Sequence, residues 1–444
     1  MSSKTLQGTK RQYRVEPGGK LKGSLRVPGD KSISHRSIML GSLAEGQTVV
    51  NGFLEGEDSL ATLNAFRTMG VTIQGPEMGQ VTIDGVGMDG LVEPQEPLDL
   101  GNSGTSMRLL SGLLAGTGLA VTLTGDSSLS GRPMGRVINP LSQMGAKIDA
   151  AEGGTAPLTL AGNQKLKGID YQLPMASAQV KSALLLAGLY AEGETCVTEP
   201  APTRDHTERM LQGFGYSVYR HGEKICLQGG GSLKGCEIDV PGDISSATFF
   251  MVGASIAEGS DVLLEHVGIN PTRDGVISIL RLMGADIELM NQREIGGEPV
   301  ADIRVRASRL KGIDIPESLV PLAIDEFPAI FIAAAYAEGE TRLRGAEELR
   351  VKESDRIQVM ADGLISLGIQ AQPTEDGITI QGGKITSGRV VSHGDHRIAM
   401  SFAMAGLGAS GIIEISDVAN VNTSFPGFVA LANQTGLTIT ESAE

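Results

Sequence analysis

Several residue types and patterns are scarce in this sequence. It contains no tryptophan, aromatic residues make up 4% of its 444 positions, and no apolar run approaches the roughly 20 residues of a membrane-spanning helix. Basic residues number 37 against 52 acidic ones, which gives a net charge of -15. This balance argues against binding to nucleic acid or to an anionic membrane surface. A small anionic substrate is not excluded, because the field inside a pocket is local.

Cysteine and histidine are also scarce, and this limits the redox and metal chemistry to be expected. Cys196, Cys226 and Cys236 form no CxxC pair, so we expect free thiols in a reducing cytoplasm. The six histidines occur in no HxH or HExxH pattern, and we expect no metal site. Residues 1–19 are polar and lack the apolar stretch of a signal peptide. The sequence therefore predicts a cytoplasmic protein.

A turn followed by a helix start at residues 27–36 predicts a binding site for a small anion. The pair at positions 28 and 29, Pro-Gly, favours the turn, and either Asp30 or Ser32 can cap the first free N–H groups. The positive end of the helix dipole favours an anion at that point. Lys31 and Arg36, about one and a half turns apart, add two full charges.

This pattern of a turn followed by a capped helix recurs along the chain. Each copy has a capped apolar helix rich in small residues, a glycine and a strand, and most copies add a second, amphipathic helix. The copies start at residues 29, 101, 176, 242, 324 and 394. The first helices are apolar on nearly all sides, so we expect them to be buried. Alternating strands such as 81–84 and 378–381 indicate sheets outside these helices. The alternative is an ordinary doubly wound sheet with six αβ layers.

A series of motifs in order resembles the enolpyruvyl transferase family, most closely the members that act on shikimate 3-phosphate. The motifs are PGDKSISHR (28–36), LGNSGTSMR (100–108), GRPMGR (131–136), MASAQVKSALLLAG (175–188), RDHTERML (204–211), GDISSA (242–247), LRVKESDR (349–356) and GDHR (394–397). They span nearly the whole chain, and a series of this length is far more specific than any one of its motifs.

The resemblance implies an α/β fold of two inside-out α/β barrel domains, each built from three βαβ-type repeats. Residues 28–241 would form one domain, and residues 1–27 with 242–444 would form the other. We expect a two-strand hinge near 27–28 and 240–242, with the active site in the interdomain cleft. Because such domains close on each other, a monomer is expected.

The resemblance also implies a reaction. The enolpyruvyl group of phosphoenolpyruvate would move to the 5-hydroxyl of shikimate 3-phosphate, with release of phosphate through a tetrahedral intermediate. Two phosphates and two carboxylates require several cations, and the proton transfers require acid and base groups, but no cofactor is needed. The expected partners are the two substrates and, as an inhibitor, glyphosate, to which the sensitivity of this chain stays open.

Matching the motifs position by position implies roles for individual residues. The catalytic groups would be Asp325, Glu353 and Lys31, and two carboxylates among cations can hold protons at different pH values. Shikimate 3-phosphate would be bound by Lys31, Ser32, Arg36, Ser177, Ala178, Gln179, Arg204, Asp325 and Lys352. Phosphoenolpyruvate would be bound by Lys31, Asn102, Gly104, Arg132, Gln179, Arg356, His396 and Arg397. Arg108 and Arg136 are either ligands or structural partners.

Several positions depart from the family pattern, and the one with the clearest consequence is Thr423. Two other functions are the alternatives. Thr423 stands where many members carry a lysine that binds phosphoenolpyruvate, so another cation such as Arg136 or Arg204 would have to compensate. A transferase acting on UDP-N-acetylglucosamine typically has a cysteine in a loop near residues 125–132, and none occurs here. A non-catalytic anion-binding relative is the other alternative. The joint presence of both carboxylates and both lysines of the implied site counts against it.

Overall fold

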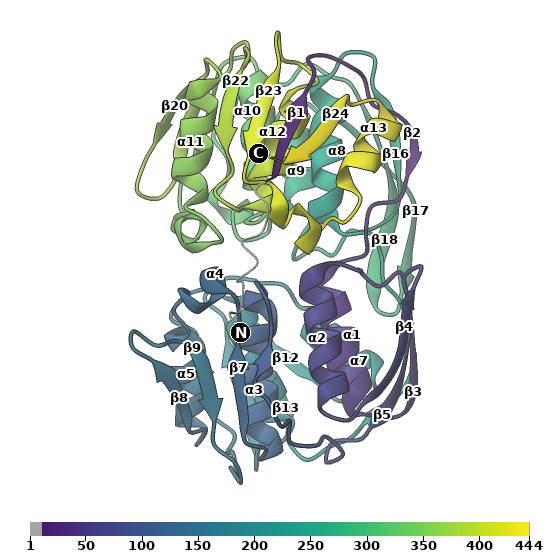
Figure 1. Ribbon diagram of the computed structural model, residues 1–444, viewed down its shortest axis with the longest axis vertical. Coiled ribbons are helices and arrows are strands. Elements are labelled where there is room, and N and C mark those ends of the chain that lie inside the picture. Colours follow the sequence, from purple (N-terminus) through teal and green to yellow (C-terminus); the bar gives the residue numbers. More distant parts are fainter. Residues whose placement is uncertain (1–10, 444) are drawn as a thin grey trace, which may run out of the picture. The chain divides into compact units, whose positions relative to one another are not determined.

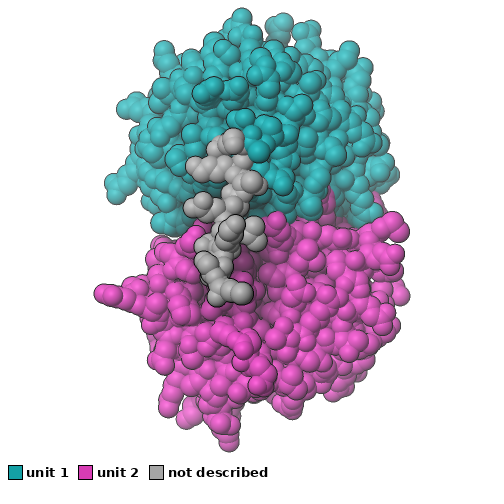
Figure 2. Space-filling view, viewed as in Figure 1, with its two compact units in different colours: residues 1–27, 242–292, 300–444 teal, residues 28–241, 293–299 magenta. Residues whose placement is uncertain are grey.

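The computed structural model describes residues 11–443, which divide into two compact units. Unit 1 comprises the described residues up to Val27, Gly242–Gln292 and the described residues from Val300 on (Figure 2). Unit 2 comprises Pro28–Pro241 and Arg293–Pro299, a short segment that the sequence prediction assigned to the C-terminal domain. Residues 1–10 and 444 of that predicted domain lie outside the described residues. Within residues 11–443, no helix is long and apolar enough to cross a membrane.

Unit 2 is built from three copies of one pattern within the described residues (Figure 1). Its central helices are α1 (Lys31–Leu43), α3 (Gly104–Thr117) and α6 (Ala178–Gly188), and its other helices are α2 (Glu57–Thr68), α4 (Ser127–Ser130), α5 (Gly135–Gln143) and α7 (His206–Gly213). The first sheet contains β3 (Ala44–Asn51), β4 (Thr72–Glu77), β5 (Gln80–Val86), β14 (Leu233–Lys234) and β15 (Glu237–Asp239). The second contains β6 (Leu98–Asp99), β7 (Val121–Thr124), β8 (Ile148–Ala151) and β9 (Thr155–Leu160). The third contains β10 (Asp170–Gln172), β11 (Glu194–Thr198), β12 (Tyr219–His221) and β13 (Lys224–Gln228).

Unit 1 repeats this pattern. Its central helices are α8 (Ile244–Ile256), α10 (Phe327–Tyr336) and α12 (His396–Ala405), and its outer helices are α9 (Gly275–Leu282), α11 (Arg356–Ser366) and α13 (Phe428–Thr435). Short 3-10 helices are η1 (Glu317–Leu319), η2 (Glu347–Val351) and η3 (Ala419–Thr423). One sheet contains β2 (Lys22–Leu25), β16 (Asp261–Gly268), β17 (Asp286–Ile295) and β18 (Glu298–Arg306). A second contains β19 (Glu340–Leu343), β20 (Gln370–Pro373) and β21 (Ile378–Gln381). The third contains β1 (Arg11–Val15), β22 (Gly388–Val391), β23 (Ile413–Ser416) and β24 (Ile439–Ala443).

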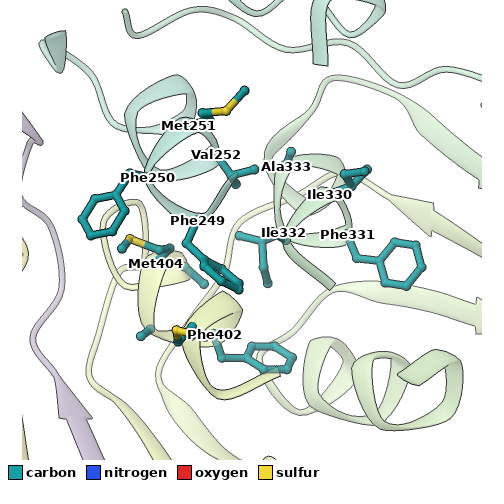
Figure 3. Close-up of a cluster of buried hydrophobic side chains, with 14 of the residues drawn as sticks. Phe249, Phe250, Met251, Val252, Ile330, Phe331, Ile332, Ala333, Phe402 and Met404 are labelled. Carbon is teal, nitrogen blue, oxygen red and sulfur yellow. The ribbon is translucent and has the colours of Figure 1, made fainter. Parts of the chain in front are cut away.

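The central helices form the core of each unit. In α8, the apolar sequence leaves no polar face, and nearly every residue of the helix is buried. Phe249 and Phe250 of α8 pack in one cluster with Ile330 of α10 and Phe402 of α12 (Figure 3). In unit 2, α3 and α6 approach so closely that a Cβ on Gly112 would lie 2.1 Å from the Ala183 carbonyl oxygen.

The strands of each unit lie outside its central helices, as Figure 1 shows. The six sheets within the described residues are separate, so the doubly wound alternative is wrong. The predicted inside-out α/β fold, with buried helices and outer sheets, is confirmed.

The expectation of three free thiols is wrong for two of them. Cys196 on β11 and Cys226 on β13 are directly paired in the antiparallel register and form a disulfide. Opposed residues on antiparallel strands bring their Cβ atoms within reach of each other. Cys236 is free, and its partial burial raises the pKa of its thiol.

Candidate active site

The beginnings of the three central helices of unit 2 are capped by side chains. Asp30, Ser103 and Ser177 accept hydrogen bonds from backbone N–H groups in the first turns of α1, α3 and α6. Of the two candidate caps at the first helix, Asp30 is therefore the one used, and Ser32 lies half-buried in the first turn. The remaining free N–H groups and the helix dipoles make each of these ends favourable for an anion.

Hydrogen bonds bring these helix ends together within unit 2. Arg36 of α1 donates from Nη2 to Ser182 Oγ of α6, at 2.8 Å. Arg108 of α3 donates from Nη1 to Gln179 Oε1 of α6, at 2.6 Å. All four residues lie in the first two turns of their helices, so the positive ends of the three helices lie at the same end of the unit.

A buried histidine supports this arrangement. His35 Nδ1 lies 2.8 Å from Thr62 Oγ1 of α2 and 3.4 Å from Ser106 Oγ of α3. Burial, reinforced by the charges of Lys31 and Arg36, holds the pKa of His35 well below its ordinary value. The imidazole is therefore neutral near pH 7 and joins α1 to α2 and α3 without adding charge.

Lys31 has a partner that the sequence analysis missed. Its ammonium donates to Oδ2 of Asp58, a buried carboxylate in the first turn of α2. Asp58 fixes the position of the Lys31 ammonium. Nothing in the sequence marked Asp58, because it belongs to no recognised motif and reaches Lys31 only through the packing of α2 on α1.

The Arg36 guanidinium is held by groups of the protein itself. It donates to the Ser32 carbonyl oxygen at 2.9 Å and to Thr207 Oγ1 at 2.7 Å, in addition to its bond with α6. Burial, opposed mainly by Glu208 and aided by Arg204, lowers the pKa of Arg36 to about 10. The charge of Arg204 contributes to this lowering, so two cations of the implied shikimate 3-phosphate site interact electrostatically.

The guanidinium groups of two further arginines, Arg108 and Arg132, lie beside Gly104. Arg132 Nη2 donates to Asn102 Oδ1 at 2.9 Å. A Cβ on Gly104 would lie 3.0 Å from Arg108 Nη1 and 3.1 Å from Arg132 Nη1, so the missing side chain leaves the guanidinium groups room beside the first turn of α3. Arg136, in contrast, is exposed at the start of α5.

In unit 1, a single arginine joins the two carboxylates of the implied acid–base pair. Arg356 is fully buried and donates to Asp325 Oδ1 at 3.1 Å, Glu353 Oε2 at 2.5 Å and Asp395 Oδ2 at 2.8 Å. Burial alone would lower the pKa of Arg356, but the three carboxylates outweigh it and raise that pKa above its ordinary value. Arg356 therefore stays charged and holds both carboxylates in place.

Two other predicted residues of unit 1, Lys352 and Arg397, contact Asp325. Lys352 Nζ lies 3.6 Å from Asp325 Oδ1 and 2.7 Å from Glu348 Oε1. Arg397 Nη1 donates to the Asp325 carbonyl oxygen at 3.2 Å. His396, buried, is the first residue of α12.

Thr423 does not replace the charge of the lysine common at its position. It is buried and donates to the Asn420 carbonyl oxygen at 2.7 Å. Asp395 is a second carboxylate that the sequence analysis did not assign, although it lies within the GDHR motif. It caps α12 and orients Arg356 at the same time.

The two sets of residues differ in the chemistry they support. Unit 2 gathers cations and helix N-termini and is equipped to bind phosphate and carboxylate groups. Unit 1 holds two carboxylates within reach of a lysine and two arginines, and is equipped for proton transfer beside an anion.

Comparison with known proteins gives consistent matches. The family model described as EPSP synthase (3-phosphoshikimate 1-carboxyvinyltransferase) matches residues 15–431. The 3-phosphoshikimate 1-carboxyvinyltransferase of Alkalilimnicola ehrlichii is 69% identical over 97% of this chain and 96% of its own length. That of Methylococcus capsulatus is 68% identical over 96% of this chain and 98% of its own length.

Two solved structures match the fold. An EPSP synthase from Acinetobacter baumannii has a TM-score of 0.88 and 63% identity, and the match covers 97% of this chain and 100% of that one. The enolpyruvyl transferase NikO from Streptomyces tendae has a TM-score of 0.79 and covers 98% of this chain and 100% of that one. At 15% identity, the second match shows a shared fold alone.

Proposed function

The chain belongs to the EPSP synthase family, and on that premise we propose which of its residues bind the substrates and move the protons. The enzyme transfers the enolpyruvyl group of phosphoenolpyruvate to the 5-hydroxyl of shikimate 3-phosphate and releases phosphate. This reaction belongs to the shikimate pathway. Its substrates are small molecules, and glyphosate inhibits members of the family. Transfer to UDP-N-acetylglucosamine is not favoured, because the high-identity relatives named above share one activity.

We propose that unit 2 supplies most of the binding groups for shikimate 3-phosphate. Arg204 and Ser177 would hold its phosphate, and Ser32 and Arg36 its ring and carboxylate. The support is the capped helix end at Ser177 and the electrostatic interaction between the cations Arg36 and Arg204. Lys31, positioned by Asp58, would lie between this substrate and phosphoenolpyruvate. The same proposal gives Ala178, Gln179, Lys352 and Asp325 a place along the shikimate ring.

For phosphoenolpyruvate we propose cations and small groups from both units. In unit 2, the support is the pair of arginines beside Gly104, of which Arg132 also holds Asn102. The proposed ligands are Lys31, Asn102, Gly104, Arg132, Gln179, Arg356, His396 and Arg397. As the family resemblance implies, this set combines residues from both units.

We propose that Asp325 is the base that takes the proton of the 5-hydroxyl. The hydroxyl oxygen then bonds to C2 of phosphoenolpyruvate while its methylene carbon, C3, takes a proton from an acid. In the second step, C3 loses a proton and phosphate leaves, which restores the double bond. Glu353 is the proposed second acid–base group. The observation that carries this assignment is the shared bond of both carboxylates to Arg356, which fixes their separation and orientation.

Three further points belong to this proposal. We propose a monomer, since each unit has a complete hydrophobic core of its own. The net charge of -15 supports the absence of a nucleic-acid partner. The cytoplasm is the proposed location because both substrates are metabolites.

The test is phosphate release from phosphoenolpyruvate with each of two acceptors. Shikimate 3-phosphate is expected to support release, and UDP-N-acetylglucosamine is not. Release with the second acceptor alone would overturn the proposal. If protein shown to be folded by circular dichroism releases no phosphate with either acceptor, the proposed activity is wrong although the fold stands.

A further inference from the structure

A fully buried lysine that the mechanism does not use lies inside unit 2. Lys181 on α6 has an exposure of 0%, and its Nζ lies 3.0 Å from Glu199 Oε1 and 2.8 Å from Glu208 Oε1. Both glutamates are also buried. Removing three charges from water is costly, and an apolar cluster of similar volume often stabilises a fold as well or better. The network therefore calls for an explanation beyond stability.

The two glutamates flank one short segment of the chain. Glu199 directly follows β11, and Glu208 lies in the first turn of α7, so residues 200–207 run between the two contacts. Within this segment, the carbonyl oxygen of Thr203 lies 3.5 Å from Lys181 Nζ, and the Thr203 hydroxyl donates to Glu199. One ammonium group thus holds the segment at its start, its middle and its end.

Arg204 follows Thr203 directly, so the network fixes the backbone beside an arginine proposed to bind phosphate. The Lys181 N–H donates to the Ser177 carbonyl oxygen at 3.1 Å, which places Lys181 one helical turn after the proposed phosphate-binding cap. Glu208 also acts on the neighbouring cation, because it opposes the lowering of the pKa of Arg36. The buried ion network therefore holds the residue next to Arg204 and lies one helical turn from Ser177, the two groups proposed to bind the phosphate.

We propose that Lys181 is a positioning residue for shikimate 3-phosphate. Its ammonium ties the segment 199–208 to α6, so that Arg204 and the start of α6 act on one phosphate group. This inference rests on the proposed function. It adds a residue that touches no substrate and yet determines the affinity for one of the two.

The experiment compares Lys181→Met and Thr203→Val with the wild-type enzyme, with Lys165→Met as the control for loss of an exposed lysine in the same unit. For each variant, KM is measured for both substrates, together with kcat and the thermal midpoint. We expect Lys181→Met to raise KM for shikimate 3-phosphate by about tenfold or more, with KM for phosphoenolpyruvate and kcat within about twofold. Thr203→Val, which leaves the ion pairs intact, should raise the same KM by about threefold. Lys165→Met should change none of these values.

A merely structural role predicts a different result. It would lower the thermal midpoint and the active fraction without separating the two KM values, and that outcome would overturn the proposal. If Lys181→Met does not fold, Thr203→Val decides by the same criterion. Failure of the wild-type enzyme to use shikimate 3-phosphate would overturn the proposed function itself. An active wild-type enzyme whose variants change both KM values equally, or neither, would overturn only the role of Lys181.

Discussion

Both units have three helices at their centre, yet the charges near the beginnings of those helices differ. In unit 2, Arg36 and Arg108 donate to neutral oxygens, so their positive charge is not cancelled by these bonds. In unit 1, Arg356 is surrounded by three carboxylates, and its charge is more than balanced. The same scaffold therefore carries positive charge in one unit and a carboxylate cluster in the other, which we propose as the anion site and the proton-transferring groups. Loss of the proposed base in unit 1 should therefore act mainly on kcat, and loss of a proposed anion ligand in unit 2 mainly on binding.

The largest effect is expected from Asp325→Ala in unit 1. Loss of a general base should lower kcat by about 10²–10⁴-fold, with a modest change in either KM. Steady-state kinetics with both substrates varied would measure this. Asp362→Asn, an exposed carboxylate on α11, is the matched control and should leave kcat unchanged. An active Asp325→Ala enzyme would remove Asp325 as the base and weaken the contrast between the units.

Arg204→Ala tests whether loss of a proposed anion ligand in unit 2 acts mainly on substrate binding. Loss of a charged hydrogen-bond donor should raise KM for shikimate 3-phosphate by about 10–100-fold, because such a bond is worth about 1.5–3 kcal/mol. The affinity for phosphoenolpyruvate should change little. Equilibrium binding of each substrate, measured by calorimetry, separates the two. An equal loss for both substrates would place Arg204 in a shared site instead.

Lowering the pH should reduce the free energy of unfolding because the fold keeps His35 neutral. Unfolded His35 takes up a proton below its ordinary pKa of 6.5, whereas the folded state keeps its pKa well below that value. The unfolded state then binds more protons, so the free energy of unfolding falls as the pH decreases below 6.5. Between pH 7 and pH 5, wild type should lose about 2 kcal/mol relative to His35→Gln, measured by urea unfolding at each pH. Parallel pH profiles would show that His35 titrates normally in the fold.

Gly104→Ala should give the smallest effect. The added methyl group would lie 3.0 Å from Arg108 Nη1 and 3.1 Å from Arg132 Nη1, so both guanidinium groups must shift by a few tenths of an ångström. We expect KM for phosphoenolpyruvate to rise by about two- to fivefold, with KM for shikimate 3-phosphate unchanged. Gly135→Ala, where a Cβ meets nothing within 4 Å, is the control. A larger change for shikimate 3-phosphate would reverse the assignment of these arginines.

The fold could be predicted because its main elements are encoded locally. The segments that became α8 and α12 each combine an aspartate cap with a mostly apolar helix. That combination predicts a buried helix wherever it occurs. The pairing of Cys196 with Cys226 could not be predicted, because it depends on the register of two strands whose cysteines are 30 residues apart.

The candidate site was predictable only in part, for a related reason. Lys31 and Arg132 lie in motifs that resemble a known family, and Asp325 lies at the start of the repeat that begins at residue 324, so a position-by-position match was enough to name them. Asp58 and Lys181 act through side chains that meet only after the helices have packed. Their positions in the sequence carry no mark of that role.

The pairing of β1 with β23 and β24 has a consequence for the order in which the chain can fold during synthesis. The strand near the N-terminus must wait for partners about 400 residues later, which at about 5–20 residues per second is on the order of 20–80 s. Unit 2, apart from Arg293–Pro299, is one continuous segment and can form its core while the ribosome is still translating unit 1. During that interval the edge of β1 is unpaired, so a nascent chain stalled before β23 should be the form of this protein most prone to aggregate.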